Sequence, residues 1–401
     1  MSVVASGGWG GSASGAPVRT ARSPFDNEPP LRWLRRLNLL PADGLGTGRR
    51  ALFLALLTWL PIALWALVSG RFHIDDGAES LLRHYGVHGR CLVAVPLLVL
   101  GERMLYGTSQ AMATRLAAVA DAEPAAKLRL DTAVASVARW GAASLPWLLI
   151  GGAAIAWSLG NRLEEHADAM AWAVDSDGAF GFGGWWFAYV SRPIFVALVF
   201  AWIWRILLLT AWCWRIGRAD LPLVPTHPDR MGGIAMVAKL PGAFALVAVA
   251  LSAVLASRWA HEILHHGAAL ASYQHTVVVF VVLWTMLMLL PLLALAPALG
   301  KVRARSLVAY SELVGLQGRL VHRRWIEGKT VGDEPILDAP EIGPVADAAV
   351  LYEAVKKMRR VPIGKVSIAM IVVPLVLPLA LVAALQIPLK TMVLDLFKVL
   401  V

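Results

Sequence analysis

The sequence predicts an all-α integral membrane protein with about seven transmembrane helices and a cytoplasmic N-terminus. Three observations lead to this fold class. Of the 401 residues, 58% are hydrophobic, only 16% are charged and 17 are Trp, a composition typical of membrane proteins rather than of soluble domains. The second observation is a series of apolar stretches of spanning length. The third is an uneven distribution of Lys and Arg between the segments that connect these stretches.

Apolar stretches of roughly the length of a bilayer core recur along the chain. A core of roughly 30 Å requires about 20 apolar residues in a helix. Seven stretches approach this length: 51–69, 91–107, 144–160, 185–211, 241–257, 276–299 and 366–387. The second is the weakest, because Glu102 and Arg103 interrupt it, and six spans remain without it. The fourth is bounded by Trp pairs, Trp185 with Trp186 and Trp212 with Trp214, as the aromatic belts of a bilayer require.

The positions of the basic residues set the orientation, because Lys and Arg concentrate in cytoplasmic loops. With seven spans and the N-terminus inside, 28 of the 37 Lys and Arg lie in inner segments and seven in outer segments. The remaining two, Arg192 and Arg205, lie inside the fourth span. This asymmetry explains the net charge of +10 without a nucleic-acid partner. The expected partners are the lipid bilayer and its anionic headgroups.

The sequence between and beyond the spans gives the domain organisation. Residues 1–30 are rich in Gly, Ser and Pro and predict a disordered tail, followed by an amphipathic segment. Residues 103–143 are Ala-rich and predict a cytoplasmic helical hairpin, with a stop and restart at Asp121, Glu123 and Pro124. The predicted parts are an N-terminal cytoplasmic segment (1–50), a membrane domain of six spans (51–299), a cytoplasmic helical segment (300–365), the seventh span (366–387) and a C-terminal tail (388–401).

Three charged residues within the spans are candidates for a substrate or ion pathway: Glu102, Arg192 and Arg205. Ionisable groups are costly in a bilayer and mark functional sites by default. The alternative is that the arginines extend their side chains to the headgroup layer. Because Glu102 and Arg205 both lie in the inner half, we expect them to pair, and exchanging the two residues should then restore what either neutral substitution loses.

The stretch "RWAHEILHHG" (258–267) contains His261-Glu262-x-x-His265, the spacing that places two imidazoles on one helix face in zinc peptidases. Its context argues against a peptidase. The motif falls in an outer loop of 18 residues, and the position where the longer zincin pattern requires Gly is Ala268. A zinc metallopeptidase is therefore the least favoured hypothesis.

A simpler metal site remains open at the outer face. Eight of the ten histidines lie on that side, and His84 and His88 form a second pair spaced like His261 and His265. Two such pairs from different loops could bind a transition metal. The alternative is a set of solvated, pH-responsive histidines. No other cofactor is indicated.

The inner loop "LPLVPTHPDRMGGIAMV" (221–237) is the most motif-like part of the chain. Its prolines favour an extended backbone, Asp229 or Thr226 can cap the helix that follows, and Gly232 and Gly233 allow close approach of an anion. Two interpretations stay open: a tight structural turn, or a phosphate or headgroup site. The residues concerned are His227, Asp229, Arg230, Gly232 and Gly233.

Several of these motifs together carry a resemblance. They are "LPLVPTHPDRMGG", the outer H-G-A-x-L stretch from His266 to Leu270, "EPILDAPEI" and "VADAAVLYEAVKKMRRVPI". The chain after residue 31 resembles an uncharacterised family of bacterial polytopic inner-membrane proteins with an H-P-D-R-x-G-G inner loop and a cytoplasmic E-P-x-L segment. The resemblance implies a fold type and a location, the bacterial inner membrane, and no activity.

The sequence favours one function and leaves others open. Spans interrupted by Pro, with Arg and Glu inside them, favour a transporter or channel for a small solute or ion. The alternative is a membrane-anchored interaction or regulatory protein that binds a cytoplasmic partner through residues 300–365. An enzyme is the least favoured class, and the sequence indicates no oligomeric state.

Overall fold

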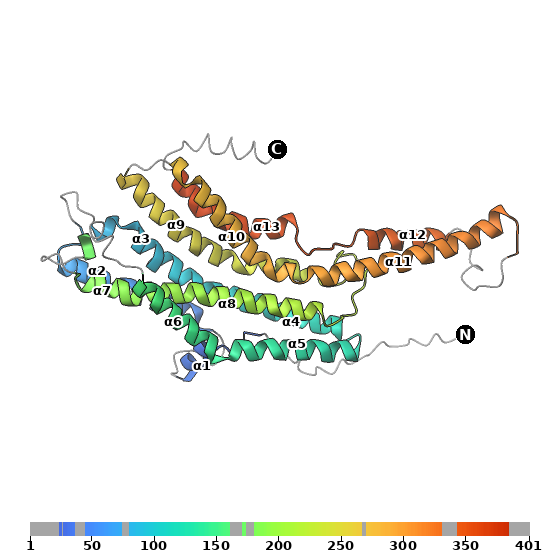
Figure 1. Ribbon diagram of the computed structural model, residues 1–401, viewed down its shortest axis with the longest axis horizontal. Coiled ribbons are helices and arrows are strands. Elements are labelled where there is room, and N and C mark those ends of the chain that lie inside the picture. The colour runs from blue at the N-terminus through green and yellow to red at the C-terminus, as the bar shows by residue number, and fades with distance from the viewer. Residues whose placement is uncertain are drawn as a thin grey trace, which may run out of the picture.

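The computed structural model describes residues 24–25, 27–36, 45–73, 80–160, 171–173, 180–266, 270–330 and 343–384. Throughout these ranges the chain forms helices and no strand, which confirms the all-α class. The long helices run along one axis of the molecule, and one pair of helices extends beyond the others at one end (Figure 1).

Six helical segments are long and apolar enough to cross a membrane, as expected of a multi-pass membrane protein. They are Thr47–Val68, Tyr85–Ala120, Phe182–Gly217, Ala235–Leu264, Gln274–Leu293 and Lys365–Ala383. A seventh crossing exists only if Pro124–Ala142 and Ser144–Gly160, which meet at a bend of 41°, form one span. The second of these helices coincides with the third predicted span, and its 17 residues fall short of the usual length.

The helices have the following bounds. Those up to residue 217 are α1 (Pro29–Arg36), α2 (Thr47–Val68), η1 (Leu81–Arg83), α3 (Tyr85–His88), η2 (Gly89–Ala94), α4 (Val95–Ala120), α5 (Pro124–Ala142), α6 (Ser144–Gly160), η4 (Ala171–Ala173), α7 (Phe182–Trp186), η5 (Phe187–Ser191) and α8 (Arg192–Gly217). The others are η6 (Ala235–Phe244), α9 (Ala245–His266), η7 (Leu270–Tyr273), α10 (Gln274–Leu293), α11 (Ala296–Val321), η8 (His322–Ile326), α12 (Gly343–Lys356) and α13 (Lys365–Ala383).

The two ends of the helix bundle differ. We call α11, η8 and α12 the arm, because they extend past the other helices (Figure 1). The arm end of the bundle also holds the turn between α4 and α5, whereas α3, α7 and the last turns of α9 lie at the opposite end, the loop end. A helical hairpin is present where residues 103–143 predicted one. Pro124 begins its second helix, since proline suits the first turn, where its missing N–H is not needed.

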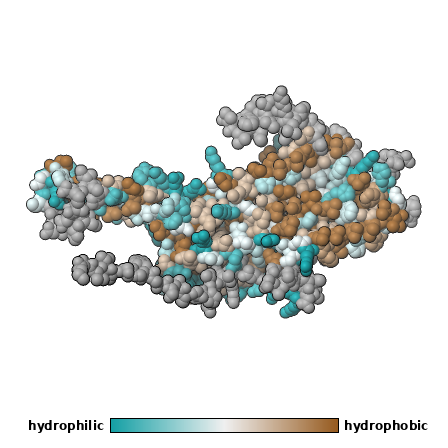
Figure 2. Space-filling view, turned by 180° about the vertical axis from the view of Figure 1, so that it is seen from behind, coloured by the Kyte–Doolittle hydropathy of each residue, from teal (hydrophilic) through white to brown (hydrophobic). Residues whose placement is uncertain are grey.

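The main core lies where α4, α8, η6 and α9 meet. Trp202, Trp212 and Phe244 are fully buried there, and the indole Nε1 of Trp202 donates a hydrogen bond of 2.9 Å to the carbonyl of Leu98. The outward side chains of α10 and α13 are apolar and exposed, among them Leu283 and Leu381. Figure 2 shows such apolar side chains covering the bundle, the surface that a bilayer would cover.

Candidate functional site

The expected pair of charged residues in the spans is present. On α4, Glu102 is buried, and its Oε1 lies 3.0 Å from Nη2 of Arg205 on α8. The other carboxylate oxygen, Oε2, lies 2.7 Å from Nη1 of Arg50, in the first turn of α2. Glu102 therefore joins three spanning segments, and Arg50 is a partner that the sequence did not reveal.

A second carboxylate completes this group. Glu28 is fully buried, with its Oε2 2.7 Å from Nη2 of Arg205 and its Oε1 3.0 Å from Nε of the same guanidinium. Such a two-point contact is the strong geometry for an Arg–carboxylate pair. We call Arg50, Glu102, Arg205 and Glu28 the charge network.

Glu28 lies in the stretch that was expected to be a disordered tail, and for the last part of residues 1–30 that expectation was wrong. The ring of Phe25 is fully buried beside Tyr106, and the Tyr106 hydroxyl donates to the Phe25 carbonyl over 2.6 Å. Nη2 of Arg32 donates to the carbonyl of Ala142 over 2.7 Å. The high content of Gly, Ser and Pro predicted disorder. A prediction from composition does not register a few side chains that anchor the segment.

The charge network is balanced. Its two guanidiniums and two carboxylates sum to zero when all four are ionised, and the Arg205 guanidinium also lies 5.5 Å from the ring centroids of both Trp147 and Trp202. A buried ion pair is stable only if each charge is compensated, and removing one partner costs about 3–5 kcal/mol. This geometry indicates a structural role: the ion pairs hold the N-terminal residues 24–25 and 27–36 against α2, α4 and α8.

Arg192, the third charged residue predicted in the spans, lies elsewhere. It begins α8 at the loop end, and the structure does not bring it to Glu102 or Arg205. The three residues predicted as one pathway therefore do not come together.

The inner loop forms a tight turn around Asp229. Its Oδ1 accepts a hydrogen bond of 2.8 Å from the backbone N–H of Met231, and its Oδ2 accepts bonds of 3.1 and 3.0 Å from those of Gly233 and Ala235. Gly232 and Gly233 have φ of 70° and 97°, values that favour glycine. Burial disfavours the Asp229 carboxylate, but the three N–H donors outweigh it, so the pKa of Asp229 lies below its ordinary value.

This geometry favours the structural interpretation of the turn. The N–H groups at the start of η6 would have to face an anion in a phosphate site, and the carboxylate of Asp229 already occupies that position. His227 also belongs to the turn, with its Nδ1 2.9 Å from Oδ1 of Asp229. Arg230 has a φ of 59°, a conformation that is uncommon outside glycine.

Two motifs of the sequence, in 221–237 and in 345–363, meet in space. The backbone N–H of Arg359 donates to the carbonyl of Arg230 over 2.8 Å, which ties the segment after α12 to the turn. Between them lies a cleft of about 440 Å³, lined by Thr226, His227, Pro228, Arg230, Ala349, Val350, Glu353, Ala354 and Lys357. We call it the motif cleft. It lies at the base of the arm, where 221–237 and 343–363 come together.

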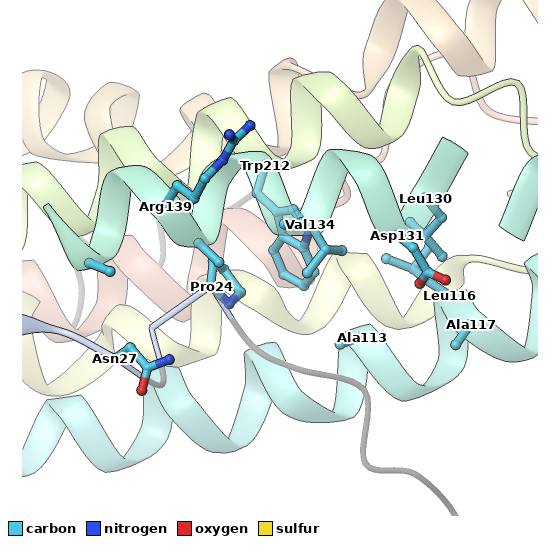
Figure 3. A pocket seen from close by; sticks show the side chains of 13 residues that line it. Pro24, Asn27, Ala113, Leu116, Ala117, Leu130, Asp131, Val134, Arg139 and Trp212 are labelled. Carbon is cyan, nitrogen blue, oxygen red and sulfur yellow. The ribbon is translucent and has the colours of Figure 1, made fainter. Parts of the chain in front are cut away.

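A larger and more apolar cavity lies between α4 and α5. Its volume is about 490 Å³, and Leu116, Leu130, Val134 and Trp212 form much of its lining. Figure 3 shows the Trp212 indole on its floor, with Asp131 near one end and Asn27 near the other. No motif in the sequence marks this cavity, because small Ala side chains create the space.

The outer histidines come together only in part. The rings of His84 and His261 lie 5.2 Å apart between centroids. His88 is committed to other contacts, because its Nδ1 accepts from Trp59 Nε1 over 3.0 Å and its Nε2 lies 2.9 Å from the Leu81 carbonyl. His88 therefore does not join His84 and His261 in the predicted four-histidine site. The side chain of His265 is outside the described residues.

Within the part of the chain that the structure describes, no three His, Cys, Asp or Glu side chains gather as a metal site requires. An outer-face transition metal and the zinc peptidase motif therefore remain predictions from the sequence. Sequence reasoning missed Glu28 and Arg50, which the sequence shows only as charged residues near the spans.

Comparisons with known proteins add no assignment to this geometry. The chain matches no protein-family model, no curated protein and no solved structure.

Proposed function

We propose that this chain is a multi-pass protein of the bacterial inner membrane that works as a membrane-anchored interaction protein and binds a partner protein through its arm. The observation that supports this most is the apolar surface of a helix pair that projects beyond the bundle. In the proposal the arm and the α4–α5 hairpin face the cytoplasm, as the distribution of basic residues predicts, and α6 provides the seventh crossing.

The arm is built as a rigid extension of a span. Only Ala294 and Leu295 separate α10 from α11, and α12 returns along α11 (Figure 1). Nη2 of Arg303 donates to the carbonyl of Lys356 over 2.9 Å, which ties the two arm helices. At the base, the bond from Arg359 to Arg230 connects the arm to the turn that begins η6. A movement of the arm on binding its partner would therefore also move the turn that begins η6.

The reach of the arm places its surface away from lipid. The 26 residues of α11 and five of η8 span about 45 Å at roughly 1.5 Å per residue. The headgroup layer is only about 5–8 Å deep on each side of the bilayer. The outer half of the arm therefore lies in water, where large exposed apolar side chains indicate a protein interface.

Five such side chains lie on the arm, each at least 51% exposed: Val308, Leu316, Trp325, Ile326 and Val350. Basic residues lie near them in the sequence, including Arg319, Arg323, Arg324 and Lys357. A complementary partner presents an apolar surface bordered by acidic residues. Aromatic and aliphatic side chains at the centre would supply affinity, and the charged rim would supply orientation.

Transport, the function that the sequence favoured, rested on spans interrupted by Pro with Arg and Glu inside them, and it loses part of this support. The charge network explains the burial of Glu102 and Arg205 through Glu28 and Arg50, without a solute.

Photo-crosslinking in living cells tests the proposal. A photoreactive amino acid replaces Leu316 or Val350 on the arm and, as a matched control, Leu128 on α5, which is 66% exposed at the same end of the bundle. We expect one discrete adduct from both arm positions and none from position 128, and Leu316→Glu should abolish the adduct from position 350. An adduct of twice the chain mass would identify a second copy as the partner.

Absence of an adduct from both arm positions would contradict the proposal. The same adducts from the control position 128 would also contradict the proposal, because crosslinking would then not be specific to the arm.

A further inference from the structure

The motif cleft lies between two segments that are far apart in the sequence. Its volume of about 440 Å³ falls within the range of about 300–1,000 Å³ that is typical of small-molecule sites. One wall is the turn 226–230, which precedes the spanning segment Ala235–Leu264, and the other is the second half of α12, which precedes Lys365–Ala383. The bond from the N–H of Arg359 to the carbonyl of Arg230 joins the two walls. The cleft therefore has a fixed shape close to the ends of two spanning segments.

Two basic side chains line the cleft, one from each wall. They are Arg230 of the turn and Lys357, which follows α12. Neither side chain forms an ion pair or a side-chain hydrogen bond with any residue in the described ranges. A single exposed cation on a convex surface is ordinarily just solvated. Here two of them share one concave space, so that a single ligand can contact both.

The carboxylates near the cleft do not neutralise these two cations. Glu353 lines the cleft, but its Oε1 lies 3.0 Å from Nζ of Lys356 on the same helix. Asp229 accepts hydrogen bonds from the backbone N–H groups of the turn and of η6. Both acidic groups already have partners, so the cleft keeps an excess of positive charge. The hydroxyl of Thr226, also in the lining, adds a neutral donor.

The backbone of Arg230 has a conformation that is costly for a residue with a side chain. Its φ of 59° lies in the left-handed region, which is disfavoured by roughly 1–2 kcal/mol outside glycine. Gly232 and Gly233 adopt positive φ in the same turn without this cost. Strained residues of this kind cluster at ligand sites. An arginine here, with no partner for its guanidinium among the described residues, indicates that the guanidinium serves a ligand.

We propose that the motif cleft binds an anion that carries a phosphate group. A guanidinium binds phosphate oxygens through paired hydrogen bonds, and the ammonium of a lysine adds a point charge. The side chains hold the anion, because Asp229 already occupies the N–H groups of the turn. The organic part of the ligand contacts the apolar part of the lining, which consists of Pro228, Ala349, Val350 and Ala354. A phospholipid headgroup and a soluble phosphate compound share this chemistry.

Arg230→Gly is the variant that tests the site most directly. It removes the guanidinium, and glycine accepts the φ of 59° without strain. The turn should therefore keep its structure, and the midpoint of thermal unfolding should be at least that of wild type. Lys357→Gln removes the second cation. The control is Arg319→Gln on the arm, which removes an exposed positive charge that does not line the cleft.

Binding is measured on the full-length protein in detergent with two probes. The first is inorganic phosphate, measured by calorimetry against chloride at equal ionic strength. The second is phosphatidylglycerol against phosphatidylcholine, with bound lipid counted by native mass spectrometry. Neither measurement contains a partner of the arm, so the result does not depend on whether the arm binds a protein.

We expect wild type to bind at least one probe. Arg230→Gly and Lys357→Gln should each weaken that binding by about tenfold, the loss of one charge-assisted contact, and Arg319→Gln should leave it unchanged. Binding of inorganic phosphate identifies a soluble ligand, and selective retention of phosphatidylglycerol identifies a headgroup. If Arg230→Gly lowers the unfolding midpoint, Lys357→Gln decides, because its exposed side chain has no partner in the described structure to lose.

Three results would overturn the proposal. The first is that wild type binds neither probe above the chloride or phosphatidylcholine control. The second is that the cleft variants bind as well as wild type, so that any bound phosphate lies elsewhere. The third is an equal loss from Arg319→Gln, which would show that the net charge of the protein, and not the cleft, attracts the anion.

Discussion

The two groups of charged residues in the membrane domain differ in how their charge is balanced. The charge network pairs two arginines with two glutamates, with contacts of 2.7–3.0 Å between Arg50, Glu102, Arg205 and Glu28. At the loop end, the guanidinium of Arg90 lies instead 5.3 Å and 5.5 Å from the ring centroids of Phe187 and Phe195. Burial of charge is common to both, so burial alone does not distinguish them. The kind of partner does: carboxylates surround the arginines of the first group, and aromatic rings surround Arg90.

Replacing the central arginine of the charge network tests this difference most strongly. Arg205→Gln leaves Glu28 and Glu102 buried next to each other without a cation between them, and we expect the free energy of unfolding to fall by about 3–5 kcal/mol. The measurement is an unfolding titration in mixed detergent micelles. Arg205→Lys is the control, because it keeps the charge and loses only part of the two-point contact.

The matched change at the other end is Arg90→Gln. It removes only the cation–π contacts to Phe187 and Phe195, so the free energy of unfolding should stay within about 1 kcal/mol of wild type. Equal losses from Arg205→Gln and Arg90→Gln would show that the two groups are not different in kind.

The charge network also shows how far sequence reasoning reached. The pairing of Glu102 with Arg205 could be predicted, because two opposite charges at the same depth in a bilayer have few other partners. Their other partners could not, because Glu28 lies in a stretch whose composition indicates disorder, and Arg50 is one of many basic residues at the inner border. For the same reason the exchange of Glu102 and Arg205 should not restore stability, since it places an arginine beside Arg50 and a glutamate beside Glu28.

A methyl group at Gly141 tests how the N-terminal segment is held. A Cβ atom there would lie 2.6 Å from the carbonyl oxygen of Pro24, so Gly141→Ala should displace residues 24–36 and cost about 1–3 kcal/mol. Hydrogen exchange of α1 should rise at the same time. The control is Gly107→Ala on α4, where no atom lies within 4 Å, and where alanine should stabilise the helix by about 0.5–1 kcal/mol.

Stabilisation by Gly141→Ala, as at Gly107, would show that the segment is not packed against α5. The segment would then contribute Glu28 to the charge network without a fixed backbone position.

The helices were easier to predict than their contacts. An apolar stretch marked each of the six long spanning helices, although the second, 91–107, is only the middle of the segment Tyr85–Ala120. Pro124 marked the start of α5, because capping is a local property. Which histidines meet is not local. His84 meets His261, while His88 contacts Trp59 and Leu81, and only the packing of α2 against η2 decides between them. Asp229 lies between these two cases. The sequence showed that Asp229 or Thr226 could cap the helix that follows, but it did not show which of the two does.

The turn at Asp229 offers the mildest test, because its charge is balanced by backbone N–H groups rather than by an arginine. The pKa of Asp229 is lower in the folded protein than the ordinary value of 3.8, so ionised Asp229 stabilises the fold at neutral pH. This contribution is complete above about pH 5 and is lost as the pH falls through 3.8 and then through the lower folded pKa.

Asp229→Asn should cost about 1 kcal/mol at pH 7, the usual value of a helix cap. The difference between wild type and variant, measured by thermal unfolding from pH 7 to pH 3, should shrink towards the acid end. A difference that stays constant with pH would mean that the charge of Asp229 contributes nothing and that only the shape of the turn matters.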